Sequence, residues 1–119
     1  MATMTRGTTP ILQFNSDVDL SDLSVAWLTF RQGNLTVTKE LSDLQQIVDG
    51  FQVKLTQSET LSFNNKTKCE IQLRGLLKDN TTAIATNIVQ VAVGEILKEG
   101  VIAVGVMPPM LRLWPRICG

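Results

Sequence analysis

The feature that most constrains this chain is a side-chain alternation with a period of two. In residues 24–32, the apolar residues Ala26, Leu28 and Phe30 alternate with mostly polar ones. Such alternation is typical of a β-strand with one face in a core, because successive side chains of a strand point to opposite sides. The pattern recurs in short segments joined by turns, without helical crossovers of a dozen residues or more. The strands must therefore pair mostly antiparallel.

Seven segments carry this pattern, and each has one apolar face that needs a covering layer. Two sheets packed face to face satisfy that need. Just before the sixth segment, Thr56 and Glu59 have the spacing of a capping box and predict one helical turn. An immunoglobulin-like sandwich crosses between its sheets at that place. We therefore predict an all-β fold, an antiparallel Ig-like β-sandwich of about seven strands, at residues 9–15, 24–32, 35–39, 44–48, 51–56, 68–76 and 83–93.

Residues 44–48 allow two interpretations. Ser42 and Gln45 have capping-box spacing, and Leu44, Ile47 and Val48 fit one face of a helix that ends at Gly50. The alternative is a hairpin with an Asp-Gly turn at residues 49–50, which is a strong short-range hairpin signal. We favour the hairpin, with Val48 opposite Phe51, although it places Gln46 on the apolar face.

A chain of 119 residues corresponds to one domain. We divide it into an N-terminal arm (1–8), the sandwich (9–100) and a C-terminal extension (101–119). Residues 101–106 are apolar enough for an eighth strand. The three prolines that follow exclude a long helix or a central strand. The extension either packs on this domain or on a neighbouring subunit, or is disordered.

Charge and residue usage exclude several classes of function. Lys and Arg number 11, as do Asp and Glu, so nothing suggests a nucleic-acid partner or an anionic membrane surface. The absence of His excludes Ser-His-Asp and Cys-His nucleophiles and His-ligated metals. The polar first ten residues do not resemble a signal peptide, and no apolar stretch has the length of a membrane span. We expect a soluble protein made in a cytoplasm.

Few side-chain groups have the chemistry of a site. Asn15, Asp17, Asp19 and Asp22 form an acidic cluster that could ligate Ca²⁺, but a solvated turn explains it better. Glu59 and Glu70 are the mid-domain acids that a hydrolase would need, and each has a structural role instead. We predict no enzyme, no cofactor, no metal and no catalytic residue. We interpret Cys69 as a small buried side chain and Cys118 as a thiol in the extension, rather than as a disulfide.

Trp27 is the aromatic residue that does not fit the core pattern. It lies on the face of its strand opposite Leu28 and Phe30. A tryptophan on an outer face is either covered by a neighbouring loop or anchors a partner, which can be a protein or a sugar ring.

Six turn and strand motifs of the chain form a familiar combination: Arg6-Gly7-Thr8-Thr9-Pro10, Asp19-Leu20-Ser21-Asp22, Leu28-Thr29-Phe30-Arg31-Gln32-Gly33, Leu55-Thr56-Gln57-Ser58-Glu59-Thr60-Leu61, Glu70-Ile71-Gln72-Leu73-Arg74 and Val93-Gly94-Glu95-Ile96-Leu97. With these motifs the chain resembles small structural proteins encoded in phage and prophage tail-gene clusters of Gram-positive bacteria. It is similar, more remotely, to the Ig-like N-terminal domain of phage baseplate upper proteins. The resemblance covers about residues 6–102 and implies a component of the virion, without any catalytic residue.

We therefore expect a non-enzymatic virion structural or assembly protein, associated with a tail or baseplate, that contacts itself or other phage structural proteins. The alternative is a sandwich module that binds carbohydrate or another host-surface group. Localisation would be the virion, after synthesis in the bacterial host cytoplasm. The interface candidates lie in the two terminal segments: Arg6, Thr8, Pro10, Val101, Ile102, Val104, Met110, Leu111 and Trp114.

Overall fold

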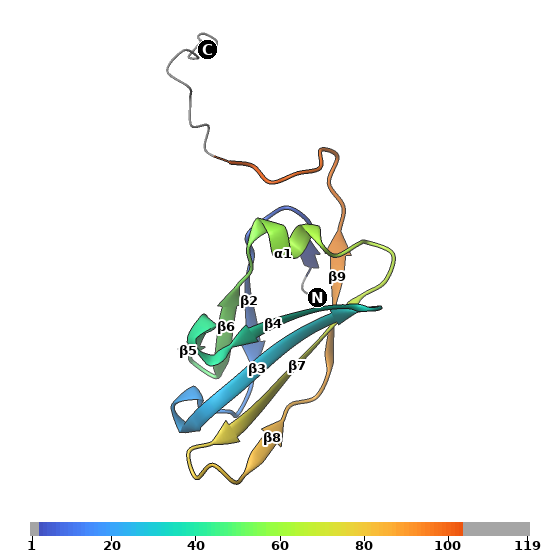
Figure 1. Cartoon of the computed structure of the whole chain (residues 1–119). Coiled ribbons are helices and arrows are strands. Elements are labelled where there is room, and N and C mark those ends of the chain that lie inside the picture. Colours follow the sequence, from blue (N-terminus) through green and yellow to red (C-terminus); the bar gives the residue numbers. More distant parts are fainter. Residues whose placement is uncertain (1–2, 104–119) are drawn as a thin grey trace.

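The described part of the protein consists of two facing β-sheets, one short α-helix and two 3-10 turns (Figure 1). The structure is a computed structural model that describes residues 3–103. One sheet has the strand order β1-β9-β7-β3-β4, with β8 paired to β7, and the other has the order β2-β6-β5. The elements are β1 (Thr3–Thr5), β2 (Ile11–Asn15), η1 (Leu20–Asp22), β3 (Leu23–Gln32), β4 (Leu35–Glu40), η2 (Leu41–Asp43), β5 (Leu44–Ile47), β6 (Gly50–Lys54), α1 (Gln57–Leu61), β7 (Cys69–Leu77), β8 (Ala83–Ala85) and β9 (Val89–Gly94).

The strand order confirms the predicted all-β, Ig-like sandwich. In chain order, β2, β3, β4, β5, β6, β7 and β9 occupy the positions of strands B, C, C′, D, E, F and G of a variable-type Ig domain. Helix α1 joins β6 of the small sheet to β7 of the large one, as the capping box predicts. Thr56 Oγ1 accepts a hydrogen bond from Glu59 N, and Glu59 Oε1 accepts one from Thr56 N.

The core lies between the sheets and follows the predicted alternation. Both sheets contribute side chains to it, and the rings of Phe14 and Phe51 stack across β2 and β6 at 5.2 Å. Two polar side chains of the described residues, Gln32 and Thr60, are also buried. The amide of Gln32 donates to Asn64 O and Thr67 O and accepts from Asn64 N, so burial leaves it fully paired. The largest buried apolar side chains include Met4, Leu28, Phe30, Val53, Leu55, Phe63, Ile71 and Leu73.

The structure corrects the predicted N-terminal arm of residues 1–8. Thr3–Thr5 form β1, which pairs in parallel with β9, from Thr3 opposite Ala92 to Thr5 opposite Gly94. The side chain of Met4 is fully buried. This segment is therefore an edge strand of the large sheet, and it is the one parallel pair among the strands of residues 3–103.

The hairpin at residues 44–54 is confirmed, with a different register. Ile47 pairs with Gly50, so the two-residue loop is Val48-Asp49, and Asp49 has a φ of 64°. The shift relative to the predicted Val48–Phe51 pair is two residues, which preserves the inward face. Gln46 is accommodated on that face because its amide accepts from Leu20 N and donates to Gly50 O.

Residues 83–93 form two short strands instead of the single predicted one. β8 and β9 both pair with β7, and the chain between them bends at Thr86. The hydroxyl of Thr86 accepts from Leu73 N, while the Thr86 N–H donates to Leu73 O. Both backbone groups of Leu73 thus stay paired across the bend.

Residues 101–106, which are apolar enough for an eighth strand, do not form one in their described part. Residues 101–103 have no regular structure, and residues 104–106 lie outside the described residues. Figure 1 shows the chain after β9 bending over the end of the sandwich that carries α1, opposite the end that carries β8.

Candidate functional site

Arg6, an interface candidate, is held inside its own domain. Its guanidinium donates to the carbonyls of Leu61 (2.8 Å) and Phe63 (2.6 Å), and forms ion pairs with Glu95 and Glu99. The side chain is only 12% exposed. The bonds to Glu99 and Glu95 raise the pKa of Arg6 above its ordinary value, and the bond from Arg6 lowers the pKa of Glu99. Arg6 therefore ties the end of α1 to the segment that follows β9.

Thr8 and Pro10 also form hydrogen bonds within the domain. The hydroxyl of Thr8 donates to Thr5 O (2.7 Å), and its carbonyl accepts from Thr60 Oγ1 (2.8 Å). The carbonyl of Pro10 accepts from Leu55 N (3.0 Å). Pro10 precedes β2, an edge strand of the small sheet, where a proline is tolerated. The three N-terminal interface candidates thus lie beside α1 and the segment that connects β6 to α1.

Val101 and Ile102 lie on the surface beside α1. Their side chains are 54% and 79% exposed. The amide of Gln57 pairs with the backbone of Ile102 in both directions, accepting from Ile102 N (2.7 Å) and donating to Ile102 O (2.9 Å). Ile102 is therefore fixed against the first turn of α1. The other four candidates, Val104, Met110, Leu111 and Trp114, lie outside the described residues.

Trp27 lies in an open groove on the outer face of the large sheet. The indole is about half exposed (48%), and Arg74 Cζ lies over its ring, 6.0 Å from the centroid. The groove has a volume of about 310 Å³. Its remaining lining residues come from β3, β7 and β8: Val25, Gly75, Leu76 and Ala83. We call this feature the Trp27 groove.

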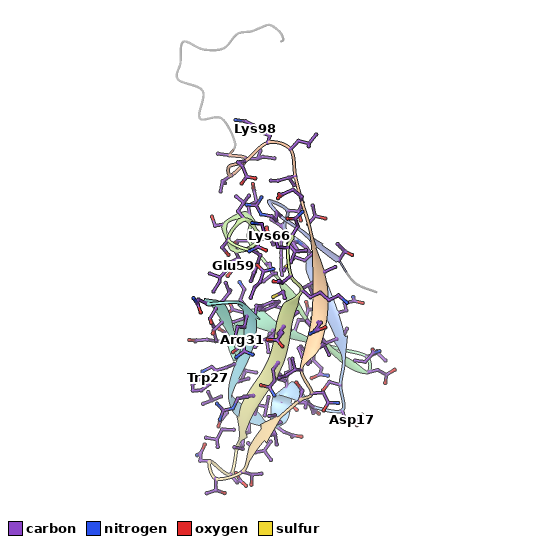
Figure 2. All side chains as sticks on the ribbon, turned by 90° about the vertical axis from the view of Figure 1, so that its right-hand side faces the viewer. Asp17, Trp27, Arg31, Glu59, Lys66 and Lys98 are labelled. Atoms are coloured by element: carbon purple, nitrogen blue, oxygen red, sulfur yellow. The ribbon has the colours of Figure 1, made fainter. Side chains whose placement is uncertain are left out.

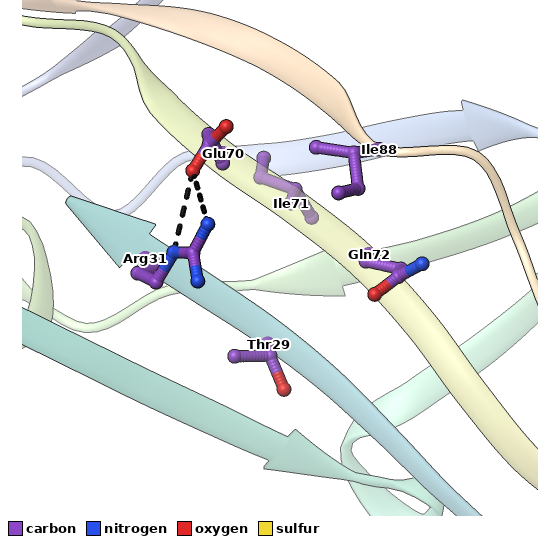
Figure 3. A pocket seen from close by; sticks show the side chains of 6 residues that line it. All are labelled: Thr29, Arg31, Glu70, Ile71, Gln72 and Ile88. Atoms are coloured by element: carbon purple, nitrogen blue, oxygen red, sulfur yellow. Dashed lines mark hydrogen bonds and ion pairs between the residues drawn. The ribbon is translucent and has the colours of Figure 1, made fainter.

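The polar half of the same outer face lies toward the other end of β3. There Thr29, Arg31, Glu70 and Gln72 line a hollow of about 100 Å³ (Figure 3). Arg31 Nη2 lies 2.8 Å from Glu70 Oε1. Trp27 and Arg31, both labelled in Figure 2, are four residues apart in β3 and therefore share its outer face. An exposed ion pair of this kind contributes little to stability, and the hollow is too small to enclose a substrate.

Three of the acidic residues singled out from the sequence, Asp19, Glu59 and Glu70, have side-chain partners within the domain. Asp19 caps η1 by accepting from Ser21 N and Ser21 Oγ, which lowers the Asp19 pKa. Burial alone would raise the pKa of Glu59, but the ion pair with Lys39 (2.8 Å) and the bond from Thr56 N lower it. Among residues 3–103, no three Cys, Asp or Glu side chains gather as metal ligands would.

Cys69 is a buried core residue of β7, as interpreted from the sequence. Burial raises the pKa of its thiol to about 11. A thiol with that pKa is almost wholly protonated at neutral pH and is a poor nucleophile.

Sequence reasoning pointed to Trp27 but missed the groove around it. The β3–β7 register places Arg74 opposite Trp27 and Leu76 opposite Val25, and β8 adds Ala83. An antiparallel pairing of residues 24–32 with 68–76 would have signalled the first two, since opposite residues share a face. Because the sequence predicted one strand at residues 83–93, the position of Ala83 beside Trp27 could not be inferred from it.

No family model, curated protein or solved structure matches the chain. In the part of the chain that the structure describes, no helix has the length and apolar character needed to cross a membrane.

Proposed function

We propose that this protein is a non-enzymatic structural module of a bacteriophage particle, associated with the tail or baseplate, that acts through contacts with identical or neighbouring subunits. The observation that carries the proposal is the Trp27 groove. Val25 and Trp27 are 43% and 48% exposed side by side on the outer face of a sheet. A half-exposed tryptophan in an apolar groove is the kind of residue that anchors protein interfaces.

Two further features support an assembly role. The resemblance at residues 6–102 implies a virion component. β4, the longest edge strand of the two sheets with six residues, has backbone groups on its outer side that can pair with another chain. Glu59 and Glu70, the acids a hydrolase would need, are in ion pairs with Lys39 and Arg31.

Sedimentation velocity of the full chain over a wide concentration range tests this function. We expect the average mass to rise above the 13.1 kDa of one chain, alone or on mixing with neighbouring particle proteins. A chain truncated after residue 100 should associate less, because the apolar extension is removed. Unchanged association would remove the extension from the proposal. A single 13.1 kDa species in every mixture would contradict the proposal.

The second candidate function is the binding of host-surface carbohydrate. Trp27 favours it, because an exposed indole flanked by the donor Arg74 suits the stacking and hydrogen bonding of a sugar ring. Glycan-array screening of the full chain tests it. Reproducible binding of a saccharide that disappears in Trp27→Ala would support this function, and an array without binding would exclude the saccharides tested.

A further inference from the structure

The Trp27 groove has the chemistry of a site for a proline-rich peptide. It offers an exposed indole face, apolar walls from Val25, Leu76 and Ala83, and the donors of Arg74. A polyproline II segment has no internal hydrogen bonds, so its carbonyls stay available to such donors while its proline rings pack on an aromatic surface. Glu40, opposite Trp27 in the β3–β4 register, adds an exposed carboxylate at the rim.

This chain carries a segment that matches the groove. Residues 107–115 read Met-Pro-Pro-Met-Leu-Arg-Leu-Trp-Pro. The adjacent prolines Pro108 and Pro109 favour polyproline II, and the apolar residues would be costly to leave together in water. Arg112 is one polyproline turn of three residues beyond Pro109 and supplies a charge complementary to Glu40.

The exit of the chain from the sandwich makes the groove of another copy the better target. Val101 lines a hollow with Lys54 and Leu55, on the small-sheet side, whereas the Trp27 groove opens on the outer face of the large sheet. Six residues from Ile102 to Pro108 span at most about 22 Å. To reach the groove of its own domain, this short segment would have to pass around the edge of the sandwich from one outer face to the other. The groove of a second copy can meet the paired prolines directly.

We propose that the Trp27 groove binds residues 107–115 of a second copy of this chain in an extended, polyproline II conformation. This inference rests on the proposed function and specifies one of its subunit contacts. The contact is heterologous, since a segment of one copy meets the sheet face of the other.

Sedimentation velocity of full-length variants tests the contact. Trp27→Ala removes the anchor of the groove, and a double variant, Pro108→Ala with Pro109→Ala, removes the paired prolines. Each should weaken association by at least about tenfold, as loss of an interface hot spot does. Ile11→Ala is the matched control, because Ile11 is 56% exposed on β2 of the other sheet. Ala83→Arg obstructs the groove from β8 without altering Trp27, and serves if Trp27→Ala does not fold.

Mixing the two defective chains separates this contact from a symmetric one. The Trp27→Ala chain keeps an intact segment, and the double proline variant keeps an intact groove. At a concentration where the wild type associates and each variant alone is monomeric, we expect the mixture to form a 1:1 heterodimer. A mixture that stays monomeric overturns the proposal, as does wild-type association in either variant. If the Trp27→Ala variant associates as tightly as the wild type, the groove contact is overturned and the proposed function still stands. If the wild type is monomeric but is found in phage particles, the groove contact is likewise overturned and the proposed function again stands.

Discussion

At the residue scale, Gly50 shows how a correct sequence signal can have a different physical cause. The pair Asp49-Gly50 predicts a turn because glycine tolerates positive φ. In the structure the positive φ belongs to Asp49, and Gly50 already lies in β6 opposite Asn15. A Cβ on Gly50 would overlap the carbonyl oxygen of Phe14. Glycine is therefore required there by the close approach of β2.

Gly50→Ala should destabilise the protein by at least about 2 kcal/mol, because backbone atoms of β2 would have to move. Gly33→Ala is the matched control. Gly33 has a φ of 60°, and a Cβ added to it would meet nothing within 4 Å, so only the left-handed backbone strain of about 1 kcal/mol applies. Urea unfolding of both variants measures the difference. Equal losses in the two variants would contradict the account of Gly50.

Arg6→Ala should destabilise the protein by about 1–3 kcal/mol, because it leaves the carbonyls of Leu61 and Phe63 without their donor. Arg6→Lys should recover only part of this loss, since an ammonium cannot reproduce the planar fork of the guanidinium. Urea unfolding compares the three chains. If Arg6→Ala were as stable as the wild type, Arg6 would not be the tie between α1 and the segment after β9.

At the element scale, the capping box of α1 is the feature that sequence and structure share most completely. Thr56→Ala removes the acceptor of Glu59 N and should cost about 1 kcal/mol. Glu59→Gln keeps an acceptor for Thr56 N but removes the ion pair with Lys39. We expect a smaller loss in Glu59→Gln than in Thr56→Ala, and thermal unfolding measures both. The reverse order would mean that the ion pair, rather than the cap, holds this turn.

The length of each strand explains why most of the fold could be predicted from the sequence and why β1 could not. Alternation in segments such as residues 24–32 and 68–76 is long enough to specify a strand and its buried face. β1 has three residues and one apolar side chain, Met4, so no period can be read from it. Its parallel partner β9 is remote in sequence. The predicted hairpin register was wrong because a shift of two residues leaves the hydrophobic pattern unchanged.

The candidate site was less predictable than the fold. Trp27 could be identified because it interrupts the apolar pattern, but Arg74 and Ala83 reach it only through the pairing of β3, β7 and β8. The sequence suggests that Arg6 faces a partner. It instead bonds to two carbonyls and two carboxylates that lie 55 to 93 residues further along the chain, which no local pattern signals.

At the scale of the whole molecule, acid should destabilise the fold. Hydrogen bonds from the Thr82 hydroxyl and from the backbone of Thr82 and Thr81 lower the pKa of Asp79 from 3.8 to about 2. The bond from Arg6 likewise lowers that of Glu99. The unfolded chain therefore binds more protons than the folded one in acid, so the stability from these groups, present above pH 4, is lost toward pH 2.

Urea unfolding at several pH values measures this dependence. Asp79→Asn should make the loss of stability between pH 4 and pH 2 less steep, because one carboxylate with a lowered pKa is removed. The difference in the free energy of unfolding between the variant and the wild type at pH 7 measures the loss of the hydrogen bonds. The change in slope between pH 4 and pH 2 measures the loss of the titrating carboxylate. Identical slopes in the variant and the wild type would show that Asp79 does not contribute.

The overall shape places two different surfaces at different positions on one sandwich. The segment after β9 leaves at the end that carries α1 (Figure 1). The Trp27 groove opens on the outer face of the large sheet, where Ala83 of β8 lines it. A module that gives a segment to one neighbour and receives one from another can be repeated many times in a particle.

Quantitative mass spectrometry of purified phage particles from the host that encodes this chain tests the central proposal most directly. We predict that its peptides copurify with the particle through a density gradient, at a constant ratio of several copies to each tail. Peptides found only in the host cytosol, with none in the particle fraction, would contradict the proposal that the chain is a structural part of the virion.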